Sequence, residues 1–101
     1  MTTWDENKRA ANLAKHGVDF AIVTGFDWST VRIEEDRDAK GEVRMRATGW
    51  IGTALYFLVY VDVTIEVEGL NGETQIVEET RIISLRKADK SEIRRYAEQQ
   101  S

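Results

Sequence analysis

The chain has 101 residues, of which 42% are hydrophobic and 32% charged, and it carries a formal net charge of −4 and no cysteine. This length and composition fit one globular domain spanning residues 1–101. The lack of cysteine excludes disulfides, zinc–thiolate centres and thiol nucleophiles. No segment approaches the roughly 20 apolar residues that cross a bilayer, and the first residues lack the basic and apolar regions of a secretion signal. We therefore expect a cytoplasmic protein with no membrane partner.

The acidic residues are concentrated in one segment. Residues 62–79 hold six acids and no Lys or Arg, whereas the remaining 12 acids face 14 cations in the rest of the chain. The negative net charge argues against binding to phosphate, which needs cations. Because the excess of acid lies in one segment, however, both ends of the chain stay locally basic.

The first predicted element is a helix over residues 5–15. Thr3 and Glu6 have the spacing of a capping box at its start, and Gly17 supplies a stop at its end. Residues at helical spacing are expected to form its buried face: Ala10, Leu13, Ala14 and Gly17. The next residues, 20–24, fit either a short helix capped by Asp19 or a strand, because Phe, Ile, Val and Thr favour strands.

Period-two alternation predicts four strands, over residues 30–34, 42–46, 54–67 and 75–85. Gly49 and Gly52 are expected to bracket one turn, and the Asn-Gly pair within Gly69–Gly72 indicates a hairpin. In the longest strand we expect one apolar face to be buried, that of Leu55, Phe57, Val59 and Val61. A closing helix is expected over residues 89–98. These elements give an α+β fold, an antiparallel four-stranded sheet with the N-terminal and C-terminal helices packed on one side.

One candidate functional cluster lies on the first predicted helix, where spacings of three and four bring four polar residues near one face: Lys8, Asn12, Lys15 and His16. Cations beside an imidazole can hold a phosphate and move a proton, because the unperturbed pKa of His is near neutrality. A solvated helix face explains the same spacing, and a lone His near a helix C-terminus is often only a favourable end charge.

A second cluster is Glu42, Arg44 and Arg46, whose alternate spacing places all three side chains on one face of a strand. A carboxylate beside two guanidiniums can act as a base next to a phosphate clamp. A ladder of ion pairs across neighbouring strands explains the same pattern without any function.

A third cluster ends the last strand and contains Arg81, Ser84, Arg86 and Lys87. Arg81 shares its side with apolar positions, so it needs a partner such as Glu79 or a place at the sheet margin. The closing helix adds further cations and Tyr96, although an ordinary amphipathic helix would look the same. With one His and no Cys, the chain lacks the ligands of a typical transition-metal site. No Gly-rich phosphate-binding loop follows a predicted strand. We therefore expect no metal and no other cofactor.

Three short motifs gain meaning from their order along the chain. They are Trp4-Asp5-Glu6 with Lys8, Asn12 and Lys15-His16-Gly17; Glu42-Val43-Arg44 followed by Gly49; and Arg81-Ile82-Ile83-Ser84 with Arg86, Ala88, Glu92 and Tyr96. In this combination the chain resembles the BrnT family of small bacterial toxins, which are ribonucleases with a RelE-like fold. The acidic residues 66–75 at the hairpin tip depart from that family pattern.

The resemblance implies a RelE-like toxin fold, with a helix rather than a strand at residues 20–24. It also implies a metal-independent endoribonuclease that cleaves RNA and inhibits translation and growth. Its partners would be RNA and a BrnA-type antitoxin encoded beside it, and DNA would be bound only through the toxin–antitoxin complex.

The implied reaction begins when a ribose 2′-hydroxyl attacks the adjacent phosphorus and expels the 5′-oxygen, which requires a base, an acid and cations. His16 or Glu42 would be the base or the acid. The arginines on the phosphate would be Arg44, Arg81 and Arg86. The residues that bind the rest of the RNA would be Lys8, Lys15, Arg46, Lys87 and Tyr96. The alternative is a non-catalytic interaction module or an inactive toxin remnant that acts through its acidic hairpin or an exposed sheet edge.

Overall fold

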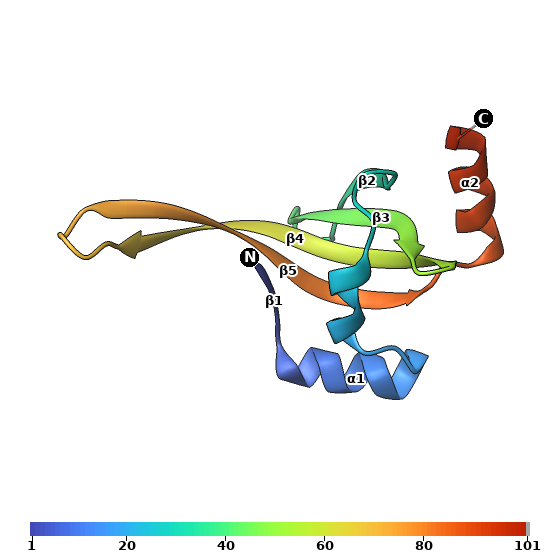
Figure 1. The fold of residues 1–101 in the computed structure, drawn as a ribbon, viewed down its shortest axis with the longest axis horizontal. Coiled ribbons are helices and arrows are strands. Elements are labelled where there is room, and N and C mark those ends of the chain that lie inside the picture. The colour runs from blue at the N-terminus through green and yellow to red at the C-terminus, as the bar shows by residue number, and fades with distance from the viewer. Residues whose placement is uncertain (101) are drawn as a thin grey trace.

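The computed structural model describes residues 1–100 and confirms the α+β class. Its elements in chain order are β1 (Thr2–Trp4), α1 (Glu6–His16), the 3₁₀ helix η1 (Phe20–Gly25), β2 (Arg32–Arg37), β3 (Val43–Ile51), β4 (Ala54–Glu68), β5 (Thr74–Lys87) and α2 (Lys90–Gln100) (Figure 1). The helix at residues 20–24 is therefore the correct alternative, and Asp19 caps it by accepting a hydrogen bond from the Ala21 amide at 2.9 Å. No helix within the described residues is long and apolar enough to span a membrane.

The sheet has five strands in the order β1-β5-β4-β3-β2, rather than four. β1 runs parallel to β5, with Thr3 beside Arg81, and the other pairs are antiparallel. The prediction of a purely antiparallel sheet was therefore wrong. Periodicity could not reveal β1, because three residues are too short to show alternation.

The start of α1 also differs from the prediction. Asp5, not Thr3, is the N-cap, and its carboxylate accepts a hydrogen bond from the Asn7 amide at 2.7 Å. Thr3 lies in β1 instead. The predicted stop is confirmed, since Gly17 has a positive φ of 68° and its N–H donates to the Leu13 carbonyl.

The residue that anchors α1 is polar, so the predicted apolar face was wrong. Asn12 is buried, whereas Leu13 is 46% exposed. The side-chain nitrogen of Asn12 donates to the backbone carbonyls of Val18 and Leu85, at 2.9 and 2.7 Å. Its side-chain oxygen accepts a 3.2 Å hydrogen bond from the backbone N–H of Leu85. β1 stops pairing with β5 at Ile82. Asn12 thus takes the place of a neighbouring strand at Leu85 and satisfies both of its backbone groups.

The predicted buried face of β4 is confirmed at Val61, which is 6% exposed, but the two faces were assigned the wrong way round at Phe57 and Val59. Leu58 is fully buried and Tyr60 is 5% exposed, in a core with Phe20 and Ile82 beneath η1 and α1. Phe57 and Val59 are only half-buried on the opposite face. Alternation alone could not choose between the faces, because Tyr56, Leu58 and Tyr60 are as large and apolar as their neighbours.

A β-bulge interrupts β5 at Ile83. Val59 pairs with Ser84, but the next residue, Tyr60, pairs with Ile82, so Ile83 has no partner. Ile82 and Leu85 are consequently both fully buried although they are three residues apart, which regular alternation forbids. The bulge leaves Ile83 and Ser84 together outside the core.

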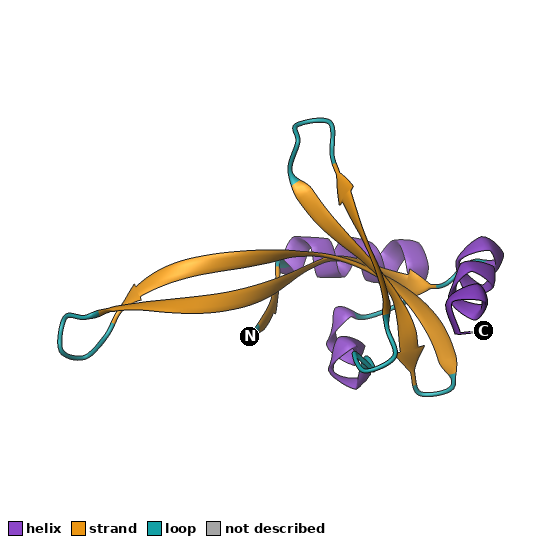
Figure 2. Cartoon of the chain, turned by 90° about the horizontal axis from the view of Figure 1, so that it is seen from above, coloured by secondary structure: helices purple, strands orange, loops and turns teal. Residues whose placement is uncertain are grey.

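The helices do not all cover one face, contrary to the prediction. α1 and η1 lie under the core face of the sheet, whereas α2 stands at its end on the other side (Figures 1 and 2). Tyr96 fixes α2 by donating a 3.0 Å hydrogen bond to the Thr30 carbonyl and by packing edge-on against Trp50. The sheet face opposite the core therefore stays open beside α2.

Gly49 lies inside β3 and does not bracket a turn as expected. A β-carbon at Gly49 would come within 2.6 Å of the Phe26 ring, so only glycine lets η1 pack this closely on the sheet. Gly52 does form the following turn, with a positive φ of 59°. The predicted hairpin at Gly69–Gly72 is confirmed between β4 and β5.

Candidate functional site

A groove of about 550 Å³ occupies the open face of the sheet beside α2. β2 to β5 supply its floor through side chains that point away from the core, and α2 supplies one wall. Its charged lining residues are Arg32, Glu34, Asp36, Arg37, Asp38, Arg44, Arg46, Arg86, Glu92 and Arg95. With six arginines against four acids, the lining has an excess of positive charge and is suited to an anion.

Ion pairs within the groove compensate four of its arginines. Arg44 lies 3.6 Å from Asp38, and the other pairs are Arg32–Glu34, Arg46–Asp36 and Arg86–Glu92. Two arginines lack such a pair among the described residues. Arg37 donates to the Gly41 carbonyl, and Arg95 has no hydrogen bond or ion pair with a described side chain. An incoming anion would therefore meet Arg37 and Arg95 without a carboxylate partner within residues 1–100, and the other four arginines in competition with neighbouring carboxylates.

Arg86 is the most firmly held arginine of the groove. Its two terminal nitrogens donate to the two oxygens of Glu92, each at 2.8 Å, and its guanidinium carbon lies 4.6 Å from the centre of the Phe57 ring. The hydrogen bonds to Glu92 raise the pKa of Arg86 above its ordinary value. Glu92 is 5% exposed and also accepts the Asp89 amide, so the pair joins the end of β5 to the start of α2.

Arg44 is less fully satisfied. Its Nε atom is buried and has no hydrogen-bond partner, and its single ion pair, with Asp38, is long. A buried donor without a partner is costly, and an acceptor from a bound molecule could relieve that cost. Among the predicted catalytic arginines, Arg44 is thus the one best prepared to hold a ligand.

A second, shallower concavity of about 240 Å³ adjoins the groove. It contains the predicted cluster of α1, because its lining residues are Lys8, Ala11, Asn12, Lys15, His16, Ile83 and Ser84. Ile83 and Ser84 also line the groove, so the β5 bulge forms the border between the two concavities. The spacing-based prediction of one α1 face is confirmed for all four residues, although the Asn12 side chain is already bonded to backbone groups.

Arg81 and Glu42 lie outside both concavities. Arg81 pairs with Glu79 at 2.7 Å and lines a third cavity of about 430 Å³, which shares Lys8 with the second. Glu42 is exposed in the turn before β3, where its amide donates to Asp38. The structure therefore brings Arg44, Arg46 and Arg86 together, sets His16 beside them across Ser84, and leaves Glu42 apart.

The remaining predicted residues lie around these concavities. Lys87 is exposed at the end of β5, beyond the lining of the groove. Tyr96 is buried, and its hydroxyl and ring are both engaged in holding α2.

Seven charged residues of the groove were not assigned to the site from the sequence: Arg32, Glu34, Asp36, Arg37, Asp38, Glu92 and Arg95. Two of them, Glu92 and Arg95, stand one helical turn apart on α2, a spacing that would have grouped them. Within residues 1–100, no three His, Cys, Asp or Glu side chains are arranged to hold a metal ion.

Known proteins with similar sequence and structure point to one kind of protein. The chain matches the model of a family described as the ribonuclease toxin BrnT of type II toxin–antitoxin systems, over residues 4–92. Its structure resembles the crystal structure of the Brucella abortus ribonuclease toxin BrnT, with 26% sequence identity and a TM-score of 0.57, over 89% of this chain and 99% of that one. No curated protein matches it in sequence.

Proposed function

We propose that this chain, which belongs to the BrnT family of ribonuclease toxins of type II toxin–antitoxin systems, is a metal-independent endoribonuclease that cleaves RNA and so inhibits translation and growth. The observation that carries the proposal is the border at Ser84. There, an arginine-lined groove meets a concavity that holds Lys8, Lys15 and His16. A phosphate at this border would have guanidiniums on one side and an imidazole on the other.

The proposed reaction uses these groups without a metal ion. The 2′-oxygen forms a bond to the neighbouring phosphorus and gives up its proton, while the bond from phosphorus to the 5′-oxygen breaks and that oxygen is protonated. The products are a 2′,3′-cyclic phosphate and a free 5′-hydroxyl. Cations are needed for the charge that develops on the phosphorane, and proton transfer requires a group that titrates near neutral pH.

Arg44 and Arg46 are the arginines we assign to the phosphate, with Arg95 as an addition to the set. Both terminal nitrogens of Arg86 are engaged by Glu92. We therefore assign Arg86 two roles: it maintains the shape of the groove, and its positive charge adds to the electrostatic potential at the phosphate. Phosphate binding must also draw Arg44 and Arg46 away from Asp38 and Asp36.

His16 is the stronger candidate for proton transfer. It borders the groove, whereas Glu42 lies in an exposed turn away from it. Lys8 and Lys15 would steer the RNA backbone along α1, and Arg81 would extend this path, because its cavity shares Lys8. Lys87 would be a peripheral contact, and Tyr96 would act only by supporting α2.

The proposed partner is a BrnA-type antitoxin that covers the groove and blocks RNA, with DNA contacted only through the complex. We expect it to bury Lys15, Arg44 and Arg86, with carboxylates against the arginines. An antitoxin that left all three exposed would contradict steric blockage.

The test is incubation of the purified chain with single-stranded RNA in excess EDTA, together with its expression alone in growing bacteria. We expect cleavage in EDTA and growth arrest. Cleavage that EDTA abolishes and a metal restores would refute metal independence.

A second candidate function is a non-catalytic interaction module. The internal ion pairs of the groove favour it, because they compensate four of its six arginines without any ligand. If the same experiment showed no cleavage and no growth arrest, the chain would be a non-catalytic interaction module.

A further inference from the structure

The outer half of the β4–β5 hairpin projects from the body of the molecule (Figures 1 and 2). The molecule extends 50 × 32 × 31 Å, and its radius of gyration of 15.4 Å exceeds the value of about 13 Å for a compact chain of this length. An isolated two-stranded ribbon is only marginally stable by itself in water. Such a projection therefore calls for a reason outside the fold.

Both edges of this projecting arm, Val61–Glu68 with Thr74–Glu79, are largely unpaired. The pairing of β3 with β4 begins at Tyr60, so within the described chain Val61–Glu68 pairs only with β5, and its opposite edge carries no strand. On the other edge, β1 pairs with β5 only from Thr80 onward. An open edge is a template for an added strand, and β4 offers the longer one.

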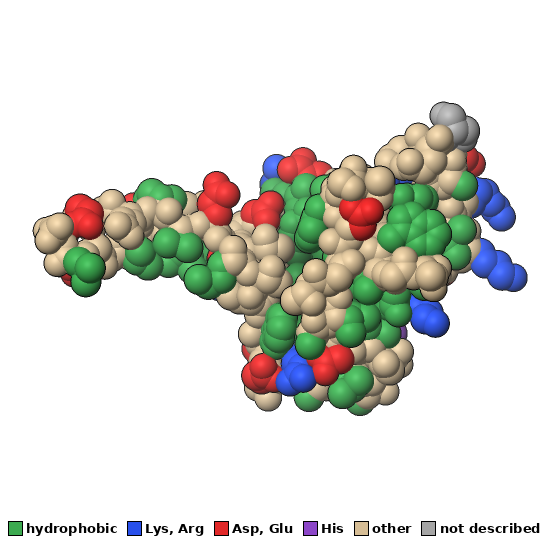
Figure 3. Space-filling view, viewed as in Figure 1, with side chains coloured by type: hydrophobic (Ala, Val, Ile, Leu, Met, Phe, Trp, Pro, Cys, Tyr) green, Lys and Arg blue, Asp and Glu red, His purple; other side chains and the backbone are tan. Residues whose placement is uncertain are grey.

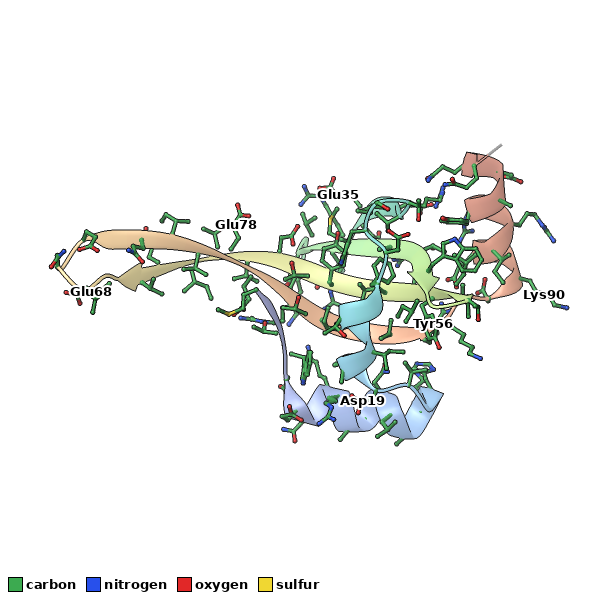
Figure 4. The ribbon with its side chains drawn as sticks, in the orientation of Figure 1. Asp19, Glu35, Tyr56, Glu68, Glu78 and Lys90 are labelled. Atoms are coloured by element: carbon green, nitrogen blue, oxygen red, sulfur yellow. The ribbon has the colours of Figure 1, made fainter. Side chains whose placement is uncertain are left out.

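The two faces of the arm differ in chemistry. Val63, Ile65 and Val67 alternate along β4 with Asp62, Thr64, Glu66 and Glu68, and the register places Val77 beside Ile65 and Glu78 beside Thr64. One face is thus mainly apolar and the other mainly acidic. Figure 3 shows acidic and apolar side chains along the arm, and Figure 4 locates Glu68 and Glu78 on it.

Large apolar side chains of the arm are exposed to solvent. Leu70 in the terminal turn is fully exposed, Ile76 is 60% exposed and Val67 is 40% exposed. Exposed apolar groups on a projecting element are typical of a binding surface.

Charge narrows the class of partner. Residues 62–79 carry six acids and no Lys or Arg, so the arm repels nucleic acid and anionic membranes. It also repels the same arm of a second copy, which disfavours pairing between arms. The partner must therefore be a basic protein segment.

We propose that the arm is the docking site for a strand of the antitoxin, which pairs with the open edge of β4 at Val61–Glu68. Cross-strand neighbours then require apolar residues of the added strand beside Val63, Ile65 and Val67, and Lys or Arg beside Asp62, Glu66 and Glu68. Leu70 enters a pocket on the same partner. The occupant is thus an extended segment in which apolar and basic residues alternate.

This inference rests on the proposed function for the identity of the partner as an antitoxin. The arm would provide a second contact, distant from the groove, through which the antitoxin would gain affinity without touching the catalytic groups. Antitoxin binding and RNA cleavage are therefore separable by substitutions in the arm.

The experiment measures binding of the antitoxin encoded beside this gene to the full chain and, in parallel, RNA cleavage. The arm variants are Glu66→Lys and Leu70→Ser. Their matched controls are Glu35→Lys on β2 and Leu13→Ser on α1, which are also exposed and lie outside the arm and the groove. We expect each arm variant to weaken binding on the order of tenfold, and Glu66→Lys to do so less at high salt, while the controls bind normally.

Hydrogen exchange supplies a readout of the backbone pairing. We expect amides within 61–68 to exchange more slowly in the complex than in the free chain. Arm variants that bind as tightly as the wild type, or unchanged exchange over 61–68, would overturn the inference. A third outcome separates the two proposals. If the wild-type chain does not cleave RNA but Glu66→Lys still weakens antitoxin binding, the proposed function is refuted and the docking site is supported.

Discussion

The inner and outer halves of the same two strands carry opposite surfaces. Where β4 and β5 are flanked by other strands, their outward side chains join a groove with six arginines. Beyond Tyr60 the flanking strand is absent, and residues 62–79 carry six acids and no Lys or Arg. The net charge of −4 is therefore a poor guide to what the protein binds, because it sums two separated surfaces of opposite sign.

The largest effect is expected from removing a groove cation. Arg44→Ala should lower the rate of RNA cleavage by roughly 100- to 1000-fold, by analogy with the loss of one oxyanion-hole donor. Single-turnover cleavage measures this, and circular dichroism checks the fold. Glu66→Lys in the arm is the control that keeps the wild-type rate. Equal rates for Arg44→Ala and wild type would make Arg44 structural.

Breaking the Arg86–Glu92 pair should destabilise the body. Glu92→Ala leaves the half-buried Arg86 guanidinium without its partner and should cost about 3 kcal/mol in the free energy of unfolding. Urea denaturation measures the loss. Glu35→Ala, at an exposed position, should change stability by less than about 0.5 kcal/mol. If the two variants were equally stable, the pair would contribute nothing to docking α2.

Asn12→Ala should cost about 2 kcal/mol, because it leaves the Leu85 amide and carbonyl without hydrogen-bond partners at the buried edge of β5. Ala11→Ser on the exposed side of α1 is a matched control for urea denaturation. An unchanged midpoint in Asn12→Ala would mean that water replaces the side chain at Leu85.

The smallest effect concerns acid stability. Hydrogen bonds from Arg9 hold the pKa of Asp19 at about 2, against an ordinary value of 3.8 (Figure 4). A depressed carboxyl pKa gives stability that is complete above 3.8 and is lost as the pH falls toward 2. Asp19→Asn should therefore make the stability of the body depend less steeply on pH between about 2 and 4. Unfolding curves across that range measure the slope, and an unchanged slope would contradict the assignment.

Most elements and their order could be predicted from alternation and turn residues, and Lys8, Lys15 and His16 could be grouped from helical spacing. The faces of β4 could not, because both are apolar around Phe57 and Leu58. The bulge at Ile83 was also hidden, since it depends on pairing with another strand. Arg81 pairs with Val61, beyond the part of β4 that lines the groove, and spacing along the chain does not encode this register.

The central claim is that residues lining the groove and the α1 concavity catalyse RNA cleavage by attack of the 2′-hydroxyl. Its most direct test is analysis of the RNA ends left by the purified chain in EDTA, by mass spectrometry, for wild type and Arg44→Ala. We predict 2′,3′-cyclic phosphates and 5′-hydroxyls from the wild type, and little product from Arg44→Ala. Ends that carry a 5′-phosphate, or equal product from both proteins, would contradict the account.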